Sequence, residues 1–84
     1  MNVIMYGMNI CPDCTEAIEI LKDYSDIKLD YREFTQATSN LKEFLKYRDT
    51  NPIFDDVKIA GNIGIPLFVR EDGYLTFNVQ ELIE

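Results

Sequence analysis

Cys11 and Cys14 are the two cysteines of the chain, and Pro12 and Asp13 separate them. Two thiols three positions apart on a helix lie on one face, where a disulfide between them needs little backbone movement. A disulfide that closes so short a loop constrains the unfolded chain very little, so a structural role is disfavoured. The pair therefore predicts either thiol–disulfide exchange or binding of a soft metal ion through two thiolates.

The absence of histidine narrows the chemistry further. Without an imidazole, the chain cannot use Ser-His or Cys-His nucleophilic catalysis or an imidazole proton shuttle. Two cysteines alone cannot supply the four ligands of a structural zinc site. Asp13 and Glu16 fall in the first turn of the expected helix, so we interpret them as charges that complement the helix dipole. Both cysteines thus remain the chemically informative residues.

Length and charge limit the partners that we expect. The chain has 84 residues, of which 46% are hydrophobic, and a net charge of −7. This length allows one domain with a thin core, and the acidic charge disfavours nucleic acids and anionic membrane surfaces. No apolar run approaches the roughly 20 residues of a membrane span. The N-terminus also lacks the basic and apolar regions of a secretory signal, so we expect a monomeric cytoplasmic domain.

The hydrophobic pattern predicts the element order β-α-β-α-α-β-β-α. We expect strands at residues 2–6, 29–34, 66–70 and 74–77, and helices at 11–24, 40–48, 51–61 and from 78 to the C-terminus. Asn40 with Glu43, and Asn78 with Glu81, predict capping boxes at two of the helix starts. The first two strands should be parallel, and the last two should form a hairpin. We therefore expect a four-stranded mixed sheet flanked by helices on both faces.

The start of the first helix assigns different roles to the two cysteines. Pro12 suits the first helical position, which places Cys11 at or next to the N-cap. Unpaired N–H groups and the positive end of the helix dipole stabilise a thiolate there. Cys14 lies one turn further inside the helix. We therefore expect Cys11 to attack a substrate disulfide and Cys14 to resolve the mixed disulfide that forms.

The sequence resembles a glutaredoxin, a member of the thioredoxin fold, over the whole chain. The resemblance is carried by Cys11-Pro12-Asp13-Cys14 after the first strand, by Gly64-Ile65-Pro66, by Asp72-Gly73 and by a closing helix. It implies one glutaredoxin-like domain over residues 1–84 that reduces protein or small-molecule disulfides. It also implies that Pro66 is a cis-proline and that the backbone of Ile65 pairs with the substrate. No bound cofactor is needed, because the electrons reside in two sulfurs, and glutathione or a flavin-dependent thioredoxin-type reductase would recharge them.

Several positions depart from the glutaredoxin pattern. Asp13 stands where many glutaredoxins have tyrosine, and no lysine precedes Cys11. Phe77-Asn78 stands where the family has two glycines, and Gln80-Glu81 where it has two acids. These departures predict poor glutathione binding, unless Lys28, Lys42 or Arg48 supplies the missing cation from elsewhere in the fold. The acidic surroundings of the Cys11 thiolate also predict a reduction potential near about −270 mV, at the thioredoxin end of the range.

Two other interpretations stay open. Residues 7–14, with Gly7-Met8 before Cys11 and Cys14, differ by one residue from the Gly-Met-x-Cys-x-x-Cys loop of copper-chaperone domains. A Cu(I)-binding module could use the same two thiols. Those domains, however, follow the second strand with a hairpin partner, whereas a helix is expected here. The third interpretation is a redox-inactive fold used for protein contact.

Overall fold

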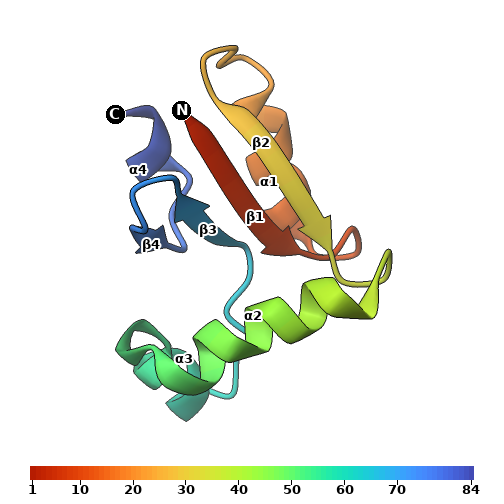
Figure 1. The fold of residues 1–84 in the computed structure, drawn as a ribbon, viewed down its shortest axis with the longest axis vertical. Coiled ribbons are helices and arrows are strands. Elements are labelled where there is room, and N and C mark those ends of the chain that lie inside the picture. The colour runs from red at the N-terminus through yellow and green to blue at the C-terminus, as the bar shows by residue number, and fades with distance from the viewer.

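Four strands form one mixed sheet in the computed structural model, which describes residues 1–84. The strands are β1 (Asn2–Gly7), β2 (Lys28–Glu33), β3 (Leu67–Arg70) and β4 (Leu75–Thr76), in the spatial order β2-β1-β3-β4. The helices are α1 (Pro12–Leu21), α2 (Thr38–Thr50), α3 (Asp55–Ile59) and α4 (Gln80–Ile83), with a 3₁₀ turn, η1 (Pro52–Phe54), before α3. β1 pairs in parallel with β2, and β3 is antiparallel to both β1 and β4. The predicted element order and mixed sheet are confirmed (Figure 1).

The sheet separates two hydrophobic clusters, as predicted for helices on both faces. One cluster holds residues from α1, α4 and the sheet, among them Cys14, Ala17, Leu21, Leu82, Val3, Met5 and Phe68. The other lies under α2 and η1 and consists of Tyr6, Phe34, Phe44, Phe54, Leu67 and Val69. In Figure 1, α2 crosses the carboxyl ends of β1 and β2, the end at which the cysteine loop leaves β1. Both elements that flank this loop, β1 and α1, are therefore anchored in the hydrophobic core.

Helix lengths differ from the prediction by a few residues. α1 ends at Leu21 because the chain then turns, with the N–H of Tyr24 donating to the carbonyl of Leu21 at 3.1 Å. α2 begins two residues before the expected start and runs to Thr50. Even this longest helix has 13 residues, and none of the helices is long and apolar enough to cross a membrane.

The two predicted capping boxes are wrong, because both glutamates accept hydrogen bonds from hydroxyl or guanidinium groups outside their own helices. Glu43 accepts from the hydroxyl of Tyr6 at 2.9 Å and from the guanidinium of Arg32. Glu81 accepts from the hydroxyl of Tyr74. Neither carboxylate bonds the first turn of its own helix, and no side chain caps α2. At α4 only the Asn78 half of the pattern forms, since its Oδ1 accepts from the backbone N–H of Gln80 at 3.0 Å. Partners outside each helix have displaced the local pattern.

Candidate dithiol site

The cysteine loop joins the end of β1 to the start of α1. Cys11 is the N-cap of α1, with extended backbone angles (φ −86°, ψ 117°), and Pro12 is the first helical residue. The backbone N–H of Cys14 donates to the Sγ of Cys11 at a donor–acceptor distance of 3.4 Å. The sulfur of Cys11 therefore takes the place of a capping oxygen. A negative charge on that sulfur is favoured by this N–H and by the dipole of α1.

The two thiols differ in their access to solvent. Cys14 is completely buried, whereas Cys11 is partly exposed. Burial, with a smaller contribution from the hydrogen bond to Cys11, raises the pKa of Cys14 to about 12. Cys14 therefore remains a neutral thiol at neutral pH, while the sulfur of Cys11 is open to a reactant.

Gly7, the last residue of β1, makes room for the buried sulfur. A Cβ atom at this position would lie 2.7 Å from the Sγ of Cys14. Since real Cβ atoms do not approach a sulfur so closely, any larger residue requires the Cys14 side chain or α1 itself to shift. Glycine is needed here for close approach of the strand to the helix.

Gly7→Ala is accordingly expected to destabilise the fold by about 1–3 kcal/mol through overpacking. Urea denaturation measures this loss. The matched comparison repeats the substitution in a Cys14→Ala background, where the sulfur is absent and most of the loss should disappear. An equal loss in both backgrounds would show that Gly7 is needed for another reason.

Glu33, at the end of β2, fixes the cysteine loop from the side. Glu33 as a residue is only 4% exposed, and its carboxylate accepts from the backbone N–H of Asn9 at 3.1 Å and from the backbone N–H groups of Thr35 and Gln36. The hydroxyl of Tyr31 donates to the Oδ1 of Asn9 at 3.0 Å. The role of Glu33 was not predicted from the sequence, because its decisive contact is to a residue 24 positions away. A polar residue at a strand end carries no signal for such a role.

Glu33→Gln is expected to weaken the fold in a pH-dependent manner. The hydrogen bond from the hydroxyl of Thr35 makes the largest contribution to holding the pKa of Glu33 below its usual range. Hydrogen bonds from the backbone N–H groups of Asn9, Thr35 and Gln36 act in the same direction. A carboxylate whose pKa is lowered by folding stabilises the protein above its unfolded pKa of about 4.3, and that stability is lost as the pH falls through the folded pKa. The urea midpoint of the variant should therefore fall further below wild type at about pH 7 than at about pH 3. Glu84→Gln at the exposed C-terminus is the control, and an equal deficit at both pH values would contradict the assignment.

Ile65 and Pro66 lie beside the cysteine loop. The peptide bond between them is cis, as the resemblance implies. Pro66 is buried, and Ile65 is half-buried and lines the same groove as Cys11. Neither the N–H nor the C=O of Ile65 has a hydrogen-bond partner within the chain. This peptide segment is therefore free to pair with an extended segment of another molecule.

Two neighbouring grooves open around this constellation. The first, which we call the Cys11 groove, has a volume of about 700 Å³. It is lined by Met8, Ile10, Cys11, Asp13, Val57, Gly61, Asn62, Ile63, Gly64, Ile65 and Phe77. The second, the Pro66 groove, has a volume of about 370 Å³ and is lined by Asp13, Glu16, Ala17, Ile20, Ile65, Pro66, Phe77, Asn78, Val79 and Gln80. Asp13, Ile65 and Phe77 line both grooves, so the two form one continuous surface around Cys11.

No lysine or arginine lines either groove. The guanidinium of Arg48 donates to the carbonyls of Ile63 and Asn62, each at 2.9 Å, and so holds the loop before Pro66. Lys28 lies at the other end of the sheet, at the start of β2. Lys42, on α2, lines neither groove, so none of these three cations takes the place of the lysine that is missing before Cys11.

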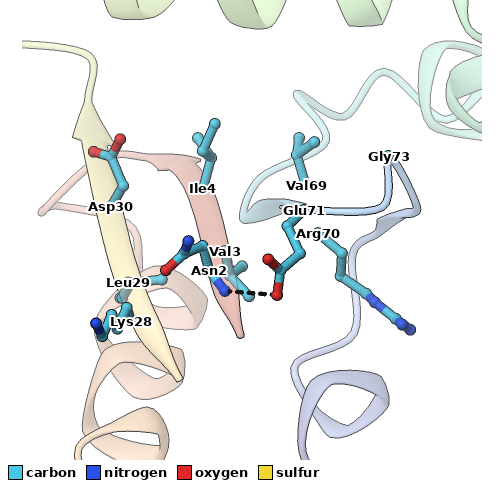
Figure 2. Close-up of a pocket in the computed structure, with 10 residues that line it drawn as sticks. All are labelled: Asn2, Val3, Ile4, Lys28, Leu29, Asp30, Val69, Arg70, Glu71 and Gly73. Carbon is cyan, nitrogen blue, oxygen red and sulfur yellow. Dashed lines mark hydrogen bonds between the residues drawn. The ribbon is translucent and has the colours of Figure 1, made fainter. Parts of the chain in front are cut away.

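Another cavity, of about 610 Å³, lies at the opposite end of β1 from the cysteines. Figure 2 shows its lining, which includes Asn2, Ile4, Lys28, Asp30, Val69 and Glu71. The backbone N–H of Asn2 donates to the carboxylate of Glu71 across it at 3.1 Å (Figure 2). The cavity contains no cysteine, and the chain holds no group of three or more metal-ligating side chains placed to bind an ion. The chemically reactive groups therefore gather at the cysteine end.

Comparison with known proteins finds a sequence similarity but no family. No protein-family model matches the chain, and no solved structure matches it. A protein of Haemophilus influenzae, described as uncharacterized, is 29% identical over 79 residues. The matched region covers 94% of this chain and 91% of that protein. The two sequences are thus similar over nearly their whole lengths.

Proposed function

We propose that this protein is a dithiol–disulfide oxidoreductase of the thioredoxin-like fold, similar to glutaredoxins, that reduces disulfides through Cys11 and Cys14. The observation that carries the proposal is the asymmetry of the two sulfurs. One is accessible at a helix N-terminus, and the other is a buried neutral thiol three residues further along. We place the activity in the cytoplasm, where protein thiols are kept reduced.

The reaction proceeds in two exchanges. The thiolate of Cys11 attacks one sulfur of the substrate disulfide, and the S–S bond of the substrate breaks. The second substrate sulfur leaves as a thiolate and takes a proton from water. Cys14 then loses its proton and attacks the sulfur of Cys11, which forms the Cys11–Cys14 disulfide and releases the first substrate sulfur. The substrate has gained two electrons, and an external dithiol or thiol reductant returns them to the protein.

The environment of Cys14 suits the second exchange. Besides burial, the hydrogen bond and the charge of Cys11 raise the pKa of Cys14. Both of these contributions from Cys11 disappear once its sulfur is part of a mixed disulfide. The pKa of Cys14 therefore falls at the step at which its thiolate is required.

Helix α2 and the buried sulfur argue against the Cu(I)-carrier alternative. After β2 the chain enters α2, where the copper-chaperone loop pattern would require a hairpin partner. The sulfur of Cys14 is packed under Gly7, so two-thiolate coordination would require this contact to open.

Catalysed reduction of a protein disulfide tests the proposal. A small amount of the chain should accelerate the reduction of a disulfide-containing protein by dithiothreitol, with the rate proportional to the amount added. The control is the Cys11→Ser/Cys14→Ser double variant. Equal rates with the wild type and the double variant would refute the proposed activity.

A further inference from the structure

The ionisable groups around Cys11 are all acidic. Apart from Cys11 itself, the lining of the Cys11 groove contains one ionisable side chain, Asp13, and the Pro66 groove adds Glu16. Both carboxylates are exposed to solvent. Since Asp13 lines both grooves, a ligand in either one lies near a negative charge.

Exposed apolar side chains complete this surface. Ile10, directly before Cys11, is 83% exposed, and Ile63, before the Ile65–Pro66 peptide, is 54% exposed. Burial of such exposed aliphatic side chains under a partner stabilises the complex. Ile65 lines the same groove, and its free N–H and C=O offer backbone pairing to an extended peptide.

We propose that this surface binds an extended segment of a protein substrate that has basic and apolar residues next to its disulfide, and that it disfavours anionic disulfides such as that of glutathione. The inference rests on the proposed function and adds the substrate class. Backbone pairing at Ile65 does not depend on the side chains of the bound peptide. The carboxylates of Asp13 and Glu16 therefore discriminate between substrates by charge. The net charge of −7 acts in the same direction at longer range.

Three basic side chains are engaged in contacts outside the two grooves. Arg48 is held by two carbonyls behind the loop, and Lys22 pairs with Glu19 at 2.7 Å. Arg32 pairs with Asp30 and Glu43 on β2 and α2. Lys58, which follows the groove-lining Val57 on α3, has no ion pair, but neither it nor any other lysine or arginine lines either groove. The charged side chains of the lining are therefore the carboxylates of Asp13 and Glu16.

Two disulfide-bridged peptides that differ only in charge test the inference. In one peptide lysines flank the disulfide, and in the other glutamates take their place. Each peptide is mixed with fully reduced protein. Alkylation and mass spectrometry then measure how fast the Cys11–Cys14 disulfide forms over a single turnover. We expect the lysine peptide to react about 10-fold faster at low ionic strength, with the ratio shrinking as salt is added.

Matched variants locate the selectivity. Asp13→Asn/Glu16→Gln should bring the ratio of the two rates close to one. Asp23→Asn/Asp26→Asn removes the same charge in the loop that follows α1, where neither carboxylate is hydrogen-bonded or ion-paired, and should leave most of the ratio intact. Equal rates for the two peptides, or a ratio that Asp13→Asn/Glu16→Gln leaves unchanged, would overturn the inference while the oxidoreductase activity stands. No reaction with either peptide would overturn the proposed function and this inference with it.

Discussion

Cys11→Ser is expected to abolish disulfide reduction, with a loss of about three orders of magnitude or more in rate. A serine hydroxyl cannot replace the thiolate that attacks the substrate, and Cys14 is buried and stays protonated. Cys14→Ser should instead retain the first exchange and stop at the mixed disulfide, because the resolving thiol is missing. Single-turnover kinetics measure the loss, and non-reducing electrophoresis detects the trapped species.

The same pair of variants also identifies the substrate. A mixed disulfide that accumulates on Cys11 in the Cys14→Ser protein carries the partner with it and is released by a reductant. Alkylation of the wild type should modify Cys11 well before Cys14, in keeping with the difference in burial. Faster alkylation of Cys14, or trapping by Cys11→Ser in place of Cys14→Ser, would reverse the assignment of roles.

A flavin-dependent thioredoxin-type reductase is expected to recharge the oxidised protein at least about 30-fold better than glutathione. Loss of one charged partner of a buried ligand group costs about 2–5 kcal/mol, which corresponds to about 30-fold or more in affinity. No cation lines the groove next to Cys11, and Phe77 and Asn78 occupy the places of the two glycines. A coupled assay on one small disulfide, with each electron source supplied in turn, measures the difference.

A gain-of-function variant sharpens this test. Ile10 is exposed and directly precedes Cys11, so Ile10→Lys restores a cation without disturbing the core. It should raise the rate with glutathione, whereas the neutral control Ile10→Gln should not. Saturable turnover of the wild type with glutathione alone at millimolar or lower concentration would contradict the expected preference.

Local patterns in the sequence predicted most of the fold. The turn at Glu71-Asp72-Gly73 joins two antiparallel strands, and Gly73 adopts the positive φ of +89° that such a turn favours. Pro12 correctly marked the first residue of α1 and thereby placed Cys11 at the N-cap. Each of these features depends on neighbours within a few residues, which is the range over which propensity and periodicity are informative.

The supporting contacts of the site could not be predicted in the same way. Glu33 holds the loop at Asn9, Arg48 holds the carbonyls before Pro66, and Gly7 meets the sulfur of Cys14 only once β1 and α1 are packed. These contacts join segments that the chain brings together from 7 to 24 positions apart, and no local pattern encodes them. The misassigned capping box at Glu43 has the same origin, since its partners Tyr6 and Arg32 lie on β1 and β2. Glu81 instead bonds Tyr74 and Thr76, which lie just before α4.

The central claim, that Cys11 and Cys14 form one redox couple, is tested most directly by a redox titration. The protein is equilibrated in thiol–disulfide buffers of graded potential, quenched by alkylation and weighed by mass spectrometry. We predict one reversible two-electron transition in which both cysteines lose their alkylation together. Its midpoint should lie near about −270 mV, because Asp13 and the acidic chain disfavour the Cys11 thiolate and with it the reduced state. A chain that stays doubly alkylated at every potential, or that oxidises only into disulfides between molecules, would contradict the account.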